Sequence, residues 1–311
     1  MKKALVWIVV LLVLLAAAGF GARRYVTLLM DERAMTSKLL GDATPMSDSI
    51  PFARLAISSG DRTLIGWWVR GTDSLAPAPA VLFLHGNRSS ISDYVPLLGF
   101  FRRQGISTML FDYTGFGASG GKASLSRAVA DAGAMARVFA ESAGPVRRTA
   151  FGSALGATVL LQAIDSIQPH VHGAVIEGVT ASVREAAIRD GRIPRFLERF
   201  IVDIADNVSA ARRVQVPLLA VHSIADPRFP LADAERVVGA LSGRSALVKH
   251  PRPGHSALLT SSRPCDWHVV LRFVRGGEMP AGTDTTDYCR VVPAADTVPV
   301  AAPPAGVSPR R

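Results

Sequence analysis

The stretch AFGSALGATV, residues 150–159, has the spacing of a sharp turn between a strand and a helix that presents a nucleophile. In the motif G-x-S-x-G the serine lies midway between two glycines, which here are Gly152 and Gly156. The residue midway between them is Ala154. Because a methyl group has no proton to lose and no lone pair to attack with, the stretch predicts the turn without its usual chemistry.

Around this stretch, short apolar runs that end in turn residues alternate with segments of helical periodicity. The strand candidates are residues 78–86, 106–113, 147–152, 171–178, 216–223 and 245–251, and the helix candidates are residues 93–105, 124–142, 155–166 and 231–243. Residues 53–70 read as a hairpin around Ser59-Gly60-Asp61. This pattern predicts an α/β fold with a mostly parallel central sheet, an antiparallel hairpin that opens it, and helices on both faces.

Composition divides the chain into one globular domain with a segment on either side. We expect the domain over residues 50–276, after a linker over residues 25–49. The alternation stops over residues 179–214, where a small helical cap is expected from apolar side chains at helical spacing: Phe196, Leu197, Phe200, Ile201 and Ile204. Residues 277–311 are rich in Pro and Ala and are expected to form a disordered tail.

The formal net charge of +10 comes mostly from scattered arginines without interleaved aromatic residues. This distribution argues against nucleic-acid binding and is compatible with weak attraction to a membrane surface. Residues 4–22 form an apolar run of 19 residues, long enough to span a bilayer, between Lys2-Lys3 and Arg23-Arg24. We therefore expect a signal anchor over residues 1–24 and an exported domain, periplasmic or extracytoplasmic; a signal peptide cleaved after Ala18 is the alternative.

The two cysteines, Cys265 and Cys289, lie 24 residues apart late in the chain. In an exported protein an even pair indicates one disulfide, which here would attach the segment after residue 276 to the last helix. Nothing nearby has the spacing of metal ligands, so no metal is expected. GFGASG at residues 115–120 matches a dinucleotide-binding turn, but the acidic residue that should follow is missing, and no cofactor is expected.

Five ordered motifs carry a resemblance to a known family: LFLHGNRSS, DYTGFGASGG, FGSALGAT, HSIADPRFP and PGH. In order and position they resemble the alpha/beta-hydrolase superfamily, and most of all its membrane-anchored branch of abhydrolase-domain and serine-aminopeptidase-like proteins. The resemblance covers about residues 50–275 and implies the alpha/beta-hydrolase fold.

The resemblance also implies roles for individual residues. Asp226 would be the acid and His255 the base of a catalytic triad, and the backbone N–H groups of Asn87 and Leu155 would form the oxyanion hole. His85 is expected to pack at a strand end. The other histidines fit neither place and are expected to be structural or solvated: His170, His172, His222, His250 and His268.

Ala154 leaves three interpretations open. The chain is a degenerate serine hydrolase, acting on ester or peptide bonds through a scaffold that has lost its nucleophile. Alternatively it is an active hydrolase, because Ala154 is an engineered replacement of a serine or because Ser153 serves as the nucleophile, although side chains alternate along a strand and Ser153 should face away from His255. The third interpretation is a non-catalytic binding or scaffold protein at the membrane. The expected ligand is a small acyl or peptide molecule, and the sequence sets neither the substrate nor the oligomeric state.

Overall fold

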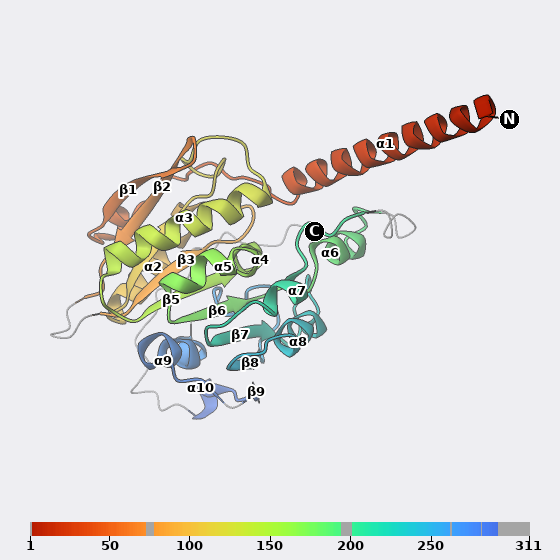
Figure 1. Ribbon diagram of the computed structural model, residues 1–311. Coiled ribbons are helices and arrows are strands. Elements are labelled where there is room, and N and C mark those ends of the chain that lie inside the picture. Colours follow the sequence, from red (N-terminus) through yellow and green to blue (C-terminus); the bar gives the residue numbers. More distant parts are fainter. Residues whose placement is uncertain (1, 73–77, 194–200, 262, 281, 292–311) are drawn as a thin grey trace.

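One sheet organises the described part of the chain, and its strand order is β1-β2-β4-β3-β5-β6-β7-β8-β9 (Figure 1). The computed structural model describes residues 2–72, 78–193, 201–261, 263–280 and 282–291. β1 and β2 form the antiparallel hairpin, β2 runs antiparallel to β4, and the pairs from β4 to β9 are parallel. The strands are β1 (Ala53–Ser59), β2 (Arg62–Val69), β3 (Ala80–Leu84), β4 (Ser107–Phe111), β5 (Arg148–Ser153), β6 (Gly173–Glu177), β7 (Leu218–Ser223), β8 (Ser245–His250) and β9 (Gly282–Asp284).

Helices cover both faces of this sheet. The α-helices are α1 (Lys2–Arg33), α2 (Val95–Arg103), α3 (Leu125–Ala143), α4 (Leu155–Gln162), α5 (Ile164–Ile167), α6 (Val183–Arg189), α7 (Asn207–Ala211), α8 (Leu231–Gly239), α9 (His268–Gly276) and α10 (Tyr288–Val291). Short 3-10 turns lie at η1 (Pro45–Asp48), η2 (Ile91–Tyr94), η3 (Gln168–His170) and η5 (Pro264–Trp267). The expected fold class is therefore confirmed.

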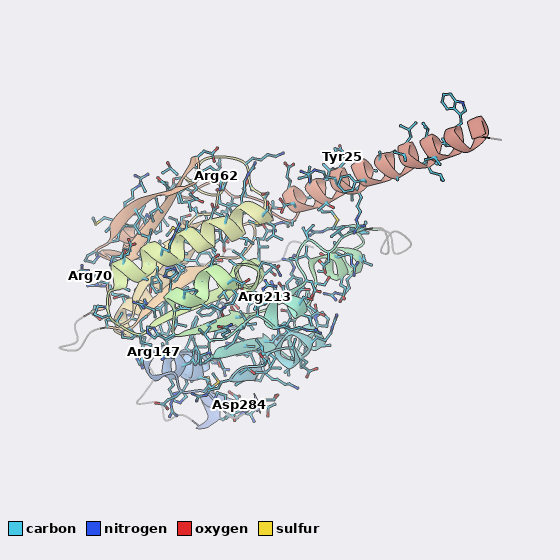
Figure 2. All side chains as sticks on the ribbon, viewed as in Figure 1. Tyr25, Arg62, Arg70, Arg147, Arg213 and Asp284 are labelled. Carbon is cyan, nitrogen blue, oxygen red and sulfur yellow. A yellow bond between two sulfur atoms is a disulfide. The ribbon has the colours of Figure 1, made fainter. Side chains whose placement is uncertain are left out.

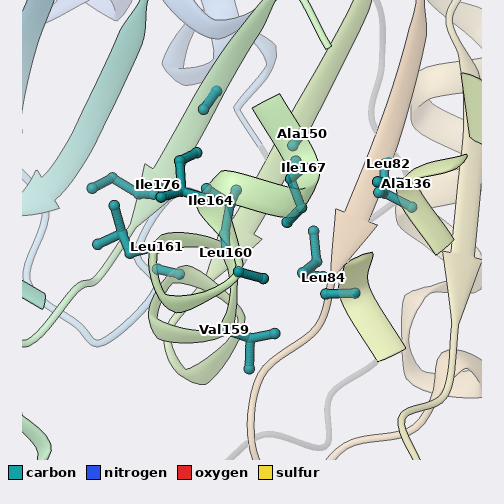
Figure 3. Close-up of a cluster of buried hydrophobic side chains, with 14 of the residues drawn as sticks. Leu82, Leu84, Ala136, Ala150, Val159, Leu160, Leu161, Ile164, Ile167 and Ile176 are labelled. Atoms are coloured by element: carbon teal, nitrogen blue, oxygen red, sulfur yellow. The ribbon is translucent and has the colours of Figure 1, made fainter. Parts of the chain in front are cut away.

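The apolar strands are buried on both sides, as their uninterrupted runs predict. In β3, Leu82 and Leu84 belong to one buried cluster while Val81 and Phe83 belong to the other, because successive side chains of a strand point to opposite faces. The first cluster includes side chains of α3, α4, α5, α7 and α8, and Figure 3 shows part of it around Leu160 and Ile176. The second cluster includes side chains of α2 and α9 together with Trp267.

Two segments differ from the expected division of the chain. The first is α1, which continues to Arg33 and so runs through the first nine residues of the expected linker. The second is the expected tail: Gly282–Asp284 adds a parallel strand to β8, and a disulfide joins Cys289 to Cys265. The expectation of disorder is therefore wrong for residues 282–291, because strand pairing and a covalent bond order a segment that lacks its own apolar periodicity. Residues 292–311 lie outside the described part.

Candidate active site

The turn at Ala154 has the strained backbone that presents a nucleophile. Ala154 lies between β5 and α4 with φ 52° and ψ −112°, a region that residues with a side chain rarely adopt. The glycines on either side are required by close packing. A side-chain carbon on Gly156 would lie 1.9 Å from the carbonyl oxygen of Leu84, and one on Gly152 would lie 2.4 Å from the carbonyl oxygen of Gly156. The sequence therefore builds the turn and leaves a methyl group at its tip.

Asp226 and His255 form a hydrogen-bonded pair in the loops that follow β7 and β8. Nδ1 of His255 is 2.8 Å from Oδ2 of Asp226. The Asp226 side chain is fully buried, whereas that of His255 is 17% exposed and so reachable from outside. The ring of Phe229 packs edge-on against the imidazole at a centroid distance of 5.0 Å. The pair has the geometry in which a carboxylate orients a general base.

The carboxylate of Asp226 is held in its ionised form. Burial would raise its pKa, but the hydrogen bond and the charge of His255 outweigh that effect together with two backbone donors, so the pKa of Asp226 lies below its usual value. The donors are the N–H groups of Arg228 and Phe229, at 2.8 and 3.0 Å from Oδ1. Nε2 of His222 lies 2.9 Å from the carbonyl oxygen of Phe229, which identifies His222 as a support of this turn.

The pair and the turn meet at the end of β6. The backbone N–H of Ala154 donates to the carbonyl oxygen of Glu177 at 2.8 Å. A side-chain carbon on the next residue, Gly178, would lie 3.4 Å from Cε1 of His255. The imidazole of His255 therefore lies close to Gly178, next to the residue that binds the N–H of Ala154.

The two expected oxyanion donors lie on either side of Ala154. Leu155 is the first residue of α4, where backbone N–H groups have no acceptor within the helix. Asn87 belongs to the loop after β3, and that loop approaches the turn: a side-chain carbon on Gly86 would lie 3.8 Å from Cβ of Ala154. Donors in these positions could stabilise a developing oxyanion.

The side chain of Asn87 is engaged elsewhere, so only its backbone is free for such a role. Its Oδ1 accepts the N–H of Thr36 at 2.7 Å, and its Nδ2 donates to the carbonyl oxygen of Ala34 at 3.0 Å. The loop is thereby attached to the segment that follows α1.

Ser153 is buried, and its hydroxyl contacts Glu177 and Ser256. Only 1% of the residue is exposed. Its Oγ donates to Oε2 of Glu177 at 3.0 Å and lies 3.2 Å from Oγ of Ser256. The contact to Glu177 follows from strand pairing, because Ser153 and Glu177 are register partners of β5 and β6.

Glu177 connects this serine to the loop that carries His255. It is 2% exposed, and its Oε1 accepts the N–H groups of Leu258 at 2.8 Å and Leu259 at 3.2 Å. Burial raises the pKa of Glu177, and the hydrogen bonds from Ser153 and the two N–H groups oppose that rise. Our sequence reasoning missed Glu177, although its place at the carboxyl end of a buried strand was the available signal.

His85 lies at the end of β3 in a fully buried aromatic environment, and its ring is 4.4 Å from that of Tyr113. Its Nε2 is 3.6 Å from Oδ1 of the equally buried Asp112. Burial lowers the pKa of His85 to about 4 and raises that of Asp112 to about 7. This packing matches the role expected for His85.

The described residues contain one group with the residue types of a metal site: Cys265, Asp266 and Cys289. Cys265 and Cys289 are joined by a disulfide, so neither sulfur is a thiolate that could bind an ion. Of the residues expected to form a cap, Phe196, Leu197 and Phe200 lie outside the described part of the chain. Ile204 is half-buried against the first core cluster.

Comparisons with known proteins support the fold. Residues 76–204 match the family model for serine aminopeptidase, S33, and residues 202–289 match the model for TAP-like protein. The chain is 27% identical over 239 residues to the uncharacterized protein Rv2307c of Mycobacterium tuberculosis, covering 76% of this chain and 82% of the relative. It is 24% identical over 225 residues to YfhR of Escherichia coli, covering 70% and 76%.

A solved structure shares the fold. The esterase Pf2001 of Pyrococcus furiosus superimposes with a TM-score of 0.56 at 18% identity, covering 71% of this chain and 91% of that chain. At this level of identity the likeness concerns the fold alone.

Proposed function

We propose that this chain, which has the alpha/beta-hydrolase fold, is a serine-hydrolase-type member of that superfamily whose covalent route is closed by Ala154. The expected reaction of the scaffold is hydrolysis of an acyl ester or a peptide bond. The proposed site keeps an acid, a base and two oxyanion donors, which together would bind the carbonyl group of a ligand. What is lost is the attacking oxygen.

The observation that carries the proposal is the hydrogen bond between His255 and Asp226 beside the strained turn. A backbone strained at a residue with a side chain costs about 1–3 kcal/mol and persists where the surroundings enforce it, most often at functional sites. A chain that had kept only the fold would have no need of both the strain and the buried carboxylate.

Without a serine, His255 is left with water as its reaction partner. In other triad enzymes that lack members of the triad, the oxyanion hole and binding alone leave about 10³-fold catalysis over solution. We propose that any turnover by this chain is of that size. The same pocket would hold an acyl or peptide ligand without converting it quickly.

We further propose that α1 is a membrane anchor and that the domain is exported. The helix Val9–Arg33 is apolar enough to cross a membrane: its most apolar 18-residue stretch has a mean hydropathy of 1.7 and no part buried against the rest of the described chain. A signal sequence has the same composition. The disulfide supports an oxidising compartment.

Ester kinetics test the proposal. Hydrolysis of a panel of p-nitrophenyl esters is measured for the chain and its Ala154→Ser variant, and also for Ala154→Ser combined with His255→Ala. We expect the serine to raise kcat/KM by at least about 10³-fold and the second substitution to remove most of the gain. No gain on any ester would favour the non-catalytic binding protein instead.

Ser153 as the nucleophile is the competing hypothesis, and its burial and its bond to Glu177 count against it. Turnover by the unaltered chain that disappears in Ser153→Ala would support it.

A further inference from the structure

The anchor helix and the globular body are joined by a helical stalk. Trp7 and Tyr25 are 72% and 63% exposed on α1, and they lie eighteen positions apart, about 27 Å at the rise of an α-helix. That length matches the apolar thickness of a bilayer, and aromatic side chains favour both of its interfaces. Beyond Tyr25 the helix continues without a break to Arg33, about 12 Å further on. Figure 2 shows Tyr25 on the part of α1 that projects from the body.

The end of this stalk is bound to the body at the start of α3. Oδ1 of Asp31 accepts the N–H of Ser126 at 2.8 Å, and Oδ2 accepts its hydroxyl at 2.6 Å. Glu32 pairs with Lys122 at 2.5 Å. The segment around Ser126 follows β4 and so lies at the carboxyl edge of the sheet, the edge that carries Ala154.

The next residues, 34–41, form a strap over the same edge. Besides the two bonds to Asn87, the carbonyl oxygen of Thr36 accepts the N–H of Arg88 at 3.0 Å, and that of Lys38 accepts the N–H of Gly117 at 2.8 Å. The N–H of Gly41 donates to Oγ of Ser92 at 2.8 Å. Arg88 and Ser92 belong to the segment that follows β3, and Gly117 belongs to the loop that follows β4.

Several exposed apolar side chains lie along this edge. Among the described residues that follow α1, the large apolar side chains most exposed to solvent are Leu39 (83%), Leu40 (36%), Met46 (68%) and Ile224 (52%). Leu39 forms a bridge with Gly117, and Ile224 is the first residue after β7. Three of the four therefore belong to the strap or to the carboxyl edge of the sheet.

We propose that the carboxyl edge of the sheet faces the lipid bilayer and that the stalk sets the distance between them. Leu39, Leu40 and Ile224 would then point toward the bilayer. The ligand would then be an acyl compound held in the bilayer, which has only the length of the stalk to cross before it reaches the site. The orientation rests on the proposed anchor, and the ligand class rests also on the proposed function. A flexible linker would leave the body free to turn, whereas a bound helix fixes the face that it presents.

Dye quenching in vesicles tests the orientation without any assay of activity. The chain has two cysteines, both in the disulfide, so Ala118→Cys and Arg70→Cys each offer one free thiol for a fluorophore. Ala118 is exposed beside Gly117, and Arg70 is exposed on the side of the body away from α1 (Figure 2). The full chain is reconstituted in phosphatidylcholine and phosphatidylglycerol vesicles that contain headgroup-nitroxide lipid.

We expect quenching at position 118 to be several times stronger than at position 70. Leu28, which is 53% exposed on the stalk, provides a matched pair of variants. Leu28→Pro breaks the helix and should reduce the contrast, whereas Leu28→Ala keeps the helix and the contrast. Equal quenching at the two positions, failure of the chain to float with the vesicles, or a contrast unchanged by the proline would overturn the orientation.

The ligand class is tested in the Ala154→Ser background with a long-chain p-nitrophenyl ester in vesicles and a short-chain ester in water. We expect Leu28→Pro to slow only the vesicle-bound ester several-fold relative to Leu28→Ala. Hydrolysis of the soluble ester with no effect of the proline on the vesicle ester would overturn the ligand class while the proposed function stands. Absence of hydrolysis with both esters would overturn both, and the quenching result would remain valid.

Discussion

Oε1 of Glu177 accepts the backbone N–H of Leu258 at 2.8 Å, three residues beyond His255. The same residue accepts the N–H of Ala154 through its own carbonyl oxygen. One buried residue thus connects the tip of the turn to the loop that carries the base. We infer that Glu177 positions His255 without touching a substrate.

Replacing Glu177 should loosen the Asp226–His255 pair. In Glu177→Ala the backbone N–H groups of Leu258 and Leu259 lose their acceptor. We therefore expect the far-downfield proton resonance of the His255–Asp226 hydrogen bond to broaden or disappear. Glu177→Gln keeps an oxygen for these donors and should retain the resonance. Ser153→Ala serves as a control, since it removes the contacts to Oε2 of Glu177 and to Oγ of Ser256 but leaves Oε1 to accept both N–H groups. A resonance unchanged in Glu177→Ala would contradict the positioning role.

The close approach of α4 to β3 predicts an intolerant glycine. Gly156→Ala would place a carbon 1.9 Å from the carbonyl oxygen of Leu84, so the helix must shift. We expect the free energy of unfolding to fall by about 3 kcal/mol or more, measured by urea denaturation. Gly120→Ala is the matched control, because no atom lies within 4 Å of the added carbon. Equal stabilities of the two variants would show that the turn is looser than described.

The buried pair of His85 and Asp112 predicts two opposite pH dependences. The folded pKa of Asp112, about 7, lies above its unfolded value, so its contribution to stability is present at low pH and is lost as pH rises toward 7. The folded pKa of His85, about 4, lies below its unfolded value, so its contribution is present above about pH 6.5 and is lost as pH falls toward 4. In the unaltered chain the two effects oppose each other.

Single variants should expose each dependence. In Asp112→Asn the free energy of unfolding should rise with pH between about 4 and 6.5, by at most about 1.4 kcal/mol per pH unit. In His85→Gln it should fall between about pH 4 and 7. Urea denaturation at a series of pH values measures both. Slopes of the same sign would contradict the assignment.

If the disulfide holds β9 in place, its removal should detach β9 from β8 while the rest of the sheet stays intact. In Cys265→Ser combined with Cys289→Ser, the loss of a 24-residue loop closure should lower the free energy of unfolding by about 3 kcal/mol. Deuterium exchange should accelerate at residues 282–284 and stay slow in β3 and β5. Unchanged exchange at residues 282–284 would show that strand pairing alone holds β9.

Sequence patterns carried the prediction of the sheet because each parallel strand is a short apolar run buried on both faces. β3 illustrates this, since all five of its residues are buried. β9 escaped prediction because Gly282, Thr283 and Asp284 have no such pattern, and their place depends on the partner strand and the disulfide. The helical stalk was not predicted, because the expected anchor ended with its apolar run, whereas α1 continues to Arg33.

The sequence likewise predicted some residues of the candidate site and missed another. Ordered motifs located Asp226 and His255, whose contact depends on the ends of two neighbouring strands. Glu177 belongs to no such motif, because its role arises from register with Ser153 and from a loop 81 residues further along the chain. Local sequence carries no record of contacts of that kind.

Covalent labelling with a fluorophosphonate probe tests the central claim most directly, because the probe reacts only with an activated hydroxyl. The account predicts no labelling of the unaltered chain, strong labelling of Ala154→Ser, and loss of that labelling when His255→Ala is added. Labelling of the unaltered chain that vanishes in Ser153→Ala, or an Ala154→Ser variant that stays unlabelled while folded, would contradict it.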